Sequence, residues 1–194
     1  MASLYTQQGS NIRKTWLLMT GFLVIVIALG WVVSQIYGNA AILYAAVAFS
    51  LVMNITAYWF SDKIALSSSG AHEADPVQYL ELHRMVENLA ITAGLPKPRV
   101  YIIDDQAPNA FAAGRDAKHA VVAVTTGLLA RLERAELEGV LAHELSHIGN
   151  RDILVMTVAV VLAGFIAIIS DIFLRMSFFG GGNRDNKNPL LLLA

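Results

Sequence analysis

The 194-residue sequence contains no cysteine. This excludes disulfides, cysteine nucleophiles and metal sites with cysteine ligands, so a metal ion would need histidine or carboxylate ligands. Lysine and arginine together number 14, against 15 aspartates and glutamates. Because there is no basic surplus to bind a phosphate backbone, nucleic acid is not an expected partner.

Charge of either sign is also scarce. Only 15% of the residues are charged and 56% are hydrophobic, whereas a typical soluble domain has about 25% charged and about 45–50% apolar residues. Two long stretches, Thr15–Ser61 and Ile153–Ser170, contain no Asp, Glu, Lys, Arg or His. Most charged residues lie between Asp62 and Asp152. The distribution predicts a membrane segment, a soluble segment and a second membrane segment.

The first charge-free stretch contains two apolar runs, Thr15–Ile36 and Ala40–Phe60. Each exceeds the roughly 20 residues that a helix needs to cross a bilayer. Gly38-Asn39 between them is typical of a turn. A cleaved signal peptide would have a shorter apolar region and no second run directly behind it. Residues 15–60 are therefore predicted to form a transmembrane helical hairpin.

Basic residues flank this hairpin on one side only. Arg13 and Lys14 precede the first run, Lys63 follows the second, and the intervening loop carries no charge. The positive-inside rule then places the N-terminal tail, residues 1–14, and the soluble segment, residues 61–152, in the cytoplasm. We expect a multi-pass protein of the inner (plasma) membrane.

The second membrane segment is predicted as a third transmembrane helix over residues 153–179. A polar loop, residues 180–188, follows it. Residues 189–194 are again apolar but too few to span a bilayer, and they are interpreted as the start of a fourth span. On this interpretation the sequence is truncated.

The soluble segment combines strand and helix patterns. Arg99–Ile103 and His119–Thr125 are predicted strands, and Arg134–Ile148 is a predicted helix with leucines repeating every four residues. Asp75-Pro76 is expected to begin an earlier helix. Ser67–Gly70 is expected to be a flexible linker.

The helix predicted at Arg134–Ile148 contains an HExxH motif formed by His143, Glu144 and His147. Residues four apart share one face of a helix, so both imidazoles can reach one metal ion. Glu144 lies about 100° around the helix from His143, where it can accept a proton from an attacking water without binding the metal. The motif predicts a zinc site in which His143 and His147 are ligands.

Two further motifs accompany HExxH: Asn109–Gly114 reads NAFAAG, and Val122–Leu129 reads VAVTTGLL. With HELSHIGNRD at His143–Asp152 and the paired apolar runs, the chain resembles the HtpX family of membrane zinc metalloproteases over its whole length. The resemblance implies an α+β zincin-like (gluzincin-type) catalytic domain inserted between transmembrane α-helices. It also implies one zinc ion, Glu144 as the general base, and membrane-protein or unfolded polypeptide substrates in membrane protein quality control.

The resemblance further implies that NAFAAG lies at a sheet edge beside the cleft, where an extended substrate pairs with it as an added strand. The candidate residues of this substrate strand are Asn109, Ala110, Phe111, Ala112, Ala113 and Gly114.

One departure from the family concerns the third zinc ligand, which in HtpX proteases is a downstream glutamate. No glutamate follows Glu144 here. Asp152 lies five positions after His147, about 140° away on a continuous helix, and is therefore poorly aimed at the same metal. The third ligand is expected beyond Ala194, so this chain alone is expected to be an inactive protease.

Two alternative functions stay open at this stage. One is a membrane metalloprotease of the CAAX-prenyl type, acting on lipidated termini, and the other is a non-catalytic membrane adaptor with an idle HExxH. Metal content distinguishes the adaptor, and cleavage of an unlipidated membrane protein distinguishes the CAAX type. The sequence names neither the cleavage preference nor the oligomeric state.

Overall fold

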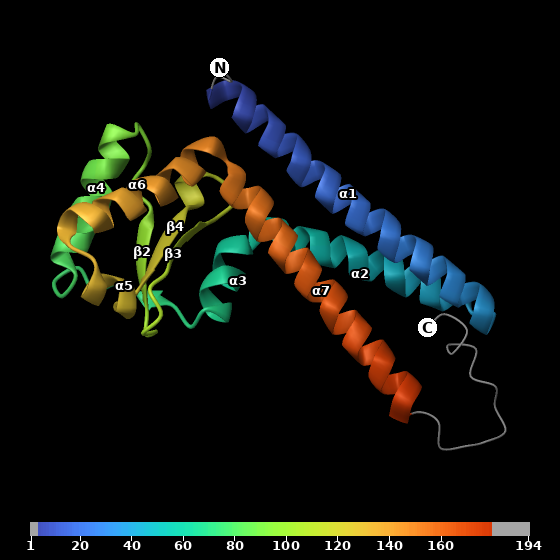
Figure 1. Ribbon diagram of the computed structural model, residues 1–194. Helices are drawn as coiled ribbons and strands as arrows, with labels where there is room; N and C mark the ends of the chain where they lie inside the picture. Colours follow the sequence, from blue (N-terminus) through green and yellow to red (C-terminus); the bar gives the residue numbers. More distant parts are fainter. Residues whose placement is uncertain (1–3, 180–194) are drawn as a thin grey trace.

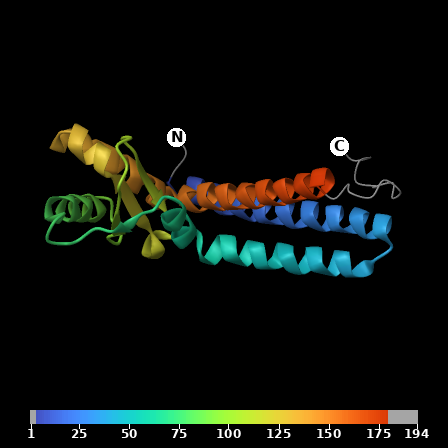
Figure 2. The same ribbon diagram turned by 90° about the horizontal axis from the view of Figure 1, so that it is seen from below.

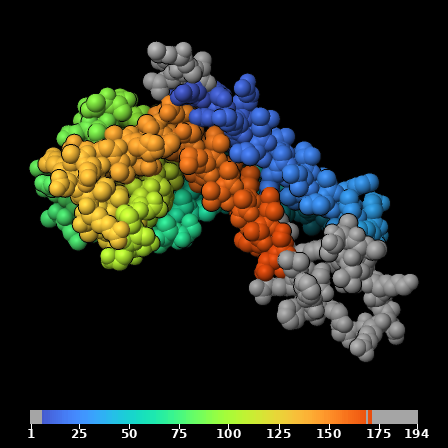
Figure 3. All heavy atoms as spheres, viewed as in Figure 1, coloured from blue at the N-terminus to red at the C-terminus, as the bar shows by residue number. Residues whose placement is uncertain are grey.

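The computed structural model describes residues 4–179, which form a bundle of long helices and a smaller α/β part (Figure 1). The long helices are α1 (Leu4–Tyr37), α2 (Ala40–Trp59) and α7 (Asp152–Phe179). They lie side by side and project from the α/β part as an arm, as Figures 2 and 3 show. The predicted polar loop at 180–188 and the start of a span at 189–194 lie outside the described residues.

Helices α1 and α2 form a tight antiparallel hairpin. Gly38 adopts a φ of 63°, and the Asn39 side chain caps α2 by accepting a hydrogen bond from the Ala41 backbone N–H at 2.9 Å. Gly30 lets the helices approach closely, because a Cβ at this position would lie only 2.3 Å from the Ala46 Cβ. Both helices are long and apolar enough to cross a membrane.

Helix α1 begins at Leu4, well before the apolar run that starts at Thr15. Its first turns are polar, and they stay helical because they contact the α/β part. The side chains of Gln8 and Asn11 donate hydrogen bonds to backbone carbonyls at the end of the HExxH helix. Deeper in the bundle, one apolar core buries Phe22 of α1, Ala57 of α2 and Val158 of α7.

The α/β part contains a four-stranded mixed sheet in the order β1-β2-β4-β3. Strand β2 pairs in parallel with β4, whereas β1 and β3 are antiparallel edge strands. All five residues of the central strand β4 are buried, which explains its continuous apolar sequence. The strand bounds are β1 His72–Glu73, β2 Arg99–Ile103, β3 Ala110–Ala113 and β4 Val121–Thr125.

Helix α6 (Arg134–Asn150) packs with α4 (Leu80–Thr92) against the sheet. The predicted leucine stripe of α6 is confirmed: Leu137, Leu141 and Leu145 are all buried in this core. The two shorter helices, α3 and α5, span Ser61–Ser68 and Thr126–Arg131.

Three local predictions need correction. The linker expected at Ser67–Gly70 is partly helical, because α3 continues to Ser68. Asp75 does not begin a long helix: its carboxylate accepts hydrogen bonds from the N–H groups of Val77 and Gln78 and caps a turn, and α4 starts at Leu80. The strand expected from His119 starts at Val121.

A short 3₁₀ helix, η1 (Ala117–His119), explains the late start of that strand. The carboxylate of Asp116 accepts hydrogen bonds from the backbone N–H groups of Lys118 and His119 and so stabilises the turn.

The chain bends sharply between α6 and α7. The axes of Arg134–Asn150 and Asp152–Ile168 differ by 87°, and if the pair is taken as one span the described residues hold up to three spans. Arg151 forms the bend with a φ of 57°, the left-handed conformation that commonly ends a helix. Helix α6 therefore lies across the end of the bundle.

Candidate metal centre

Helix α6 brings together the three residues of the HExxH motif. The Nε2 atoms of His143 and His147 are 3.2 Å apart, and the ring planes meet at 84° with centroids 4.7 Å apart. The buried Leu141 and Leu145 fix the opposite face of the helix in the core. As a result His143 is exposed, whereas Glu144 and His147 are partly buried at the surface.

Asp152 contacts the far ring nitrogen of His147. Its Oδ2 lies 3.0 Å from His147 Nδ1, which leaves Nε2 directed toward His143. A carboxylate in this position fixes the orientation and the tautomer of a metal-ligating histidine. Asp152 therefore contacts His147 only through Nδ1, where it orients the ring, and it does not lie beside Nε2.

The angle of about 140° expected between His147 and Asp152 assumes a continuous helix. In the structure the helix ends at Asn150, and the left-handed Arg151 turns the chain back. The local signal for such a break was Gly149-Asn150, a pair that commonly ends helices.

The predicted substrate strand lies beside Glu144. Residues Ala110–Ala113 form the edge strand β3, and the Ala112 backbone N–H donates a hydrogen bond to Glu144 Oε2 at 3.1 Å. Asn109 bonds to Thr125 at the start of the strand. The backbone groups of successive residues in an antiparallel strand point to opposite sides. Because Asn109 bonds toward β4, the backbone groups of Ala110 and Ala112 point away from β4, to the open edge.

Gly114 ends β3 in a conformation that other residues rarely adopt. Its φ is 138°, and a Cβ here would lie 2.5 Å from the carbonyl oxygen of His119. The glycine that closes the NAFAAG motif thus lets the chain leave the edge strand and turn tightly into η1.

The ring nitrogens of His143 and His147 fit part of the ligand set of a zinc ion. Two imidazole Nε2 atoms converge from one helix face, with Asp152 behind one ring, which is the arrangement that zinc-binding histidines require. Within residues 4–179, no group of three or more His, Asp or Glu side chains could hold a metal ion. A catalytic zinc site usually has three protein ligands, and His143 and His147 together would supply two of them.

The other histidines have different partners. His83 Nε2 lies 3.0 Å from the Ala74 carbonyl oxygen, and His119 lies between Asp116 and Arg115. His72 lies 3.8 Å from Asp104 at the surface.

The fold packs a helix with HExxH under a mixed sheet and joins it to long apolar helices. Residues 76–191 match the pattern of peptidase family M48, more than half of the chain. The chain belongs to peptidase family M48.

Relatives described as "Protease HtpX homolog" align along nearly all of this chain. The one from Caldanaerobacter subterraneus subsp. tengcongensis is 47% identical over 98% of this chain and 66% of its own length. The one from Thermoanaerobacter pseudethanolicus is 48% identical, over 96% and 63%. The one from Pyrococcus furiosus is 46% identical, over 93% and 62%.

These relatives confirm the resemblance to the HtpX family that the motifs indicated. The chain spans slightly less than two thirds of the length of these relatives.

Proposed function

We propose that this protein is a membrane-embedded zinc endopeptidase whose catalytic domain has the α+β zincin-like (gluzincin-type) arrangement. The observation that carries the proposal is the convergence of His143 and His147 Nε2 atoms at 3.2 Å, with Glu144 held against the edge strand β3. Membership of family M48 supports the same assignment. A further ligand comes from outside residues 4–179.

His143 and His147 would hold the zinc, and Asp152 keeps the His147 ring in place through Nδ1. When bound, zinc polarises the scissile carbonyl and increases the acidity of the attacking water. Glu144 takes the proton that this water loses and passes it to the departing amide nitrogen. The hydrogen bond from the Ala112 N–H fixes one carboxylate oxygen, so the other can face the water.

The open edge of β3 would hold the substrate. The Ala112 N–H is held by Glu144, but the outward N–H and C=O of Ala110 and the outward C=O of Ala112 can pair with an extended peptide, which brings its backbone alongside Glu144. The residues of the whole substrate strand are those of the NAFAAG motif, Asn109 to Gly114.

The site lies close to the end of the helix bundle, because only Arg151 separates α6 from α7, the third apolar helix. With α1 and α2 in the inner membrane, the cleft meets the juxtamembrane parts of other membrane proteins first. We therefore propose that the substrates are integral membrane proteins and that the protein acts in membrane protein quality control. The catalytic domain would lie in the cytoplasm.

The catalytic assignment is tested on the full-length protein in detergent. Glu144→Gln should keep its zinc, measured by elemental analysis, and lose at least about 100-fold in cleavage of an unfolded or membrane-embedded substrate. His143→Ala and His147→Ala should lose zinc as well. Ser146→Ala, on the same helix, is the matched control and should keep both. A Glu144→Gln variant as active as the parent would contradict the proposal.

The topology is tested with a reporter that is active only in the cytoplasm. Fused after Asp75, it should be active, because the charges around the first hairpin place this segment inside. Fused in the α1–α2 turn, Tyr37–Asn39, it should be inactive. The reverse pattern would overturn the cytoplasmic placement.

A further inference from the structure

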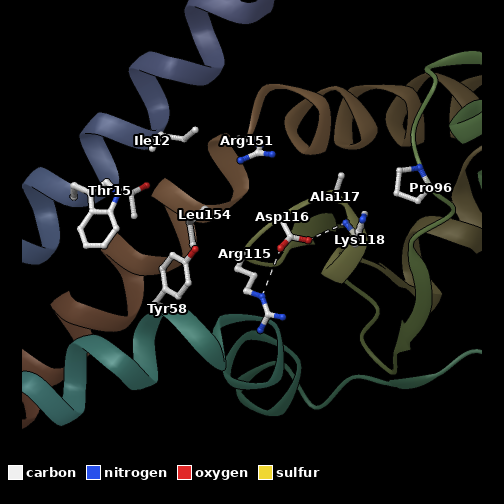
Figure 4. A pocket seen from close by; sticks show the side chains of 11 residues that line it. Ile12, Thr15, Tyr58, Pro96, Arg115, Asp116, Ala117, Lys118, Arg151 and Leu154 are labelled. Atoms are coloured by element: carbon white, nitrogen blue, oxygen red, sulfur yellow. Dashed lines mark hydrogen bonds and ion pairs between the residues drawn. The ribbon is translucent and has the colours of Figure 1, made fainter.

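A cavity of about 470 Å³ lies where the long helices meet the α/β part (Figure 4). One wall comes from α1, α2 and α7 and includes Tyr58 and Leu154. The opposite wall carries the basic side chains of Arg115, Lys118 and Arg151. No residue of the HExxH motif lines this cavity, so it is a separate feature of the molecule. We call it the junction pocket.

One acidic residue, Asp116, also lines the junction pocket, but its carboxylate is already engaged. It accepts hydrogen bonds from two backbone N–H groups and from the His119 Nδ1, and it pairs with Arg115 at 3.5 Å. Although partial burial opposes ionisation, the hydrogen bonds from His119 hold the pKa of Asp116 below its ordinary value. Asp116 thus shapes the loop.

Lys118 and Arg151 have no such partner. Both side chains are exposed, and neither forms an ion pair with any other residue in the 4–179 range. Their positive charges face the junction pocket uncompensated, from two segments that are far apart in the sequence.

Arg115 extends the basic wall toward the bundle. Its guanidinium lies 4.6 Å from the ring centroid of Trp59, at the end of α2. A second hollow shares Arg115 and Lys118 with the junction pocket and adds Lys63 and Arg99, of which Arg99 pairs with Asp62 in the same hollow. Basic side chains therefore gather near the end of α2, in excess over the one acidic residue there.

We propose that the junction pocket binds the phosphate headgroup of an anionic phospholipid. A phosphate placed between Lys118, Arg151 and Arg115 would complement their charge, and arginine is well suited to phosphate oxygens. Basic pockets between transmembrane helices are common sites for anionic headgroups. The proposal depends on the membrane placement of α1 and α2 and not on proteolytic activity.

The apolar wall argues for a lipid as the occupant. Ile12 and Trp16 are exposed and continue from the junction pocket onto the surface of α1, while the buried Leu154 of α7 lines the pocket from the bundle core. Trp16 and Tyr58 are the aromatic residues that favour the membrane–water boundary. A lipid whose headgroup fills the basic wall would lay its acyl chains along this apolar surface.

Such a lipid would touch the junction of the catalytic helix. Arg151 is the left-handed residue that joins α6 to α7, and its neighbour Asp152 contacts His147. Binding at the junction pocket would therefore stabilise the bend that holds the metal site at the membrane surface.

The test uses the full-length protein in a neutral detergent and native mass spectrometry with two probes, dioleoyl-phosphatidylglycerol and dioleoyl-phosphatidylcholine. The phosphatidylglycerol should bind more tightly. Lys118→Gln/Arg151→Gln should weaken its binding about 30-fold, because each basic residue near an anionic lipid surface contributes about fivefold. Binding of phosphatidylcholine should not change.

The matched control is Arg84→Gln/Arg131→Gln, which removes two exposed arginines of α4 and α5, far from the bundle. It should bind phosphatidylglycerol as the parent does. Should the first double variant fail to fold, Lys118→Gln alone should weaken binding about fivefold.

Equal losses in both double variants, or none in either, would overturn the proposal. Inorganic phosphate at millimolar concentration should not displace the lipid, and displacement would show that a soluble phosphate is the occupant instead. Loss of lipid binding with proteolysis retained would support the proposal, whereas inactive protein that still binds lipid would contradict only the proposed function.

Discussion

The side-chain amide of Gln8 donates a hydrogen bond to the backbone carbonyl of Gly149 at 2.6 Å, joining residues 141 positions apart in the sequence. Asn11 makes a similar bond to the Asn150 carbonyl at 3.1 Å. The last carbonyls of a helix have no partner within it. The first turns of α1 therefore act as a cap for the helix that carries the HExxH motif.

Replacing both residues, as Gln8→Ala/Asn11→Ala, should lower the free energy of unfolding by about 2 kcal/mol, since two hydrogen bonds are lost. Thermal unfolding in detergent is the measurement. Gln7→Ala, an exposed neighbour on the same helix, is the control. Equal stability of the double variant and the control would show that the two bonds contribute nothing.

Asp152→Asn should weaken zinc binding about 10- to 100-fold, because the contact with His147 Nδ1 orients a ligand. Competition with a chromophoric chelator measures the affinity on the full-length protein. Asp104→Asn, at an exposed carboxylate away from the site, is the control. An Asp152→Asn variant with unchanged affinity would remove Asp152 from the site.

Gly127→Ala should destabilise the α/β part by about 1–3 kcal/mol, since the added Cβ would lie 2.2 Å from the Gln106 backbone oxygen. Gly139→Ala is the matched control in α6, where a Cβ meets nothing within 4 Å. It should instead stabilise the protein by up to about 1 kcal/mol through helix propensity. Chemical unfolding followed by circular dichroism separates the two signs.

Gly30→Val should disturb the α1–α2 hairpin, because even a Cβ would lie 2.3 Å from the Ala46 Cβ. Gly21→Val, where nothing lies within 4 Å, should be tolerated. Unfolding of both variants in mixed detergent micelles with increasing sodium dodecyl sulfate measures the difference. A Gly30→Val protein as resistant as Gly21→Val would mean that the hairpin packs differently.

The stabilising contribution of Asp116 should depend on pH. Its pKa is lowered in the folded protein, against the opposing effect of burial, by hydrogen bonds from His119. Such a group contributes fully above its unfolded pKa of about 4 and loses its contribution as pH falls through the folded pKa.

Asp116→Asn should therefore lower the melting temperature at pH 7, and the difference from the parent should shrink below about pH 4. A difference that grows toward acid pH would reverse the assigned sign.

Sequence reasoning worked best where the relevant contacts are local. The spacing of His143 and His147 places both on one helix face, and the structure brings their Nε2 atoms together. The leucine stripe of α6 likewise identified its buried face. Both features depend only on the helical period.

The same reasoning was weaker where distant segments meet. The two-residue strand β1 carries no pattern of its own and exists because His72 and Glu73 pair with β2. The helical start of α1 at Leu4 depends on contacts with α6. The contact between Asp152 and His147 Nδ1 could not be predicted from a continuous helix, because one left-handed residue, Arg151, changes every angle measured beyond it.

The 87° bend at Arg151 also has a consequence for how a membrane-bound target would be chosen. Under the proposed function, because α6 runs nearly at right angles to α7, the height of His143 and His147 above the bilayer is set by the few residues around the bend. A substrate anchored in the same membrane could reach Glu144 only with a tether of sufficient length, at about 3.3 Å for each extended residue. The distance of a peptide bond from the membrane anchor would then determine where the protein cleaves, and the identity of the neighbouring side chains would matter less.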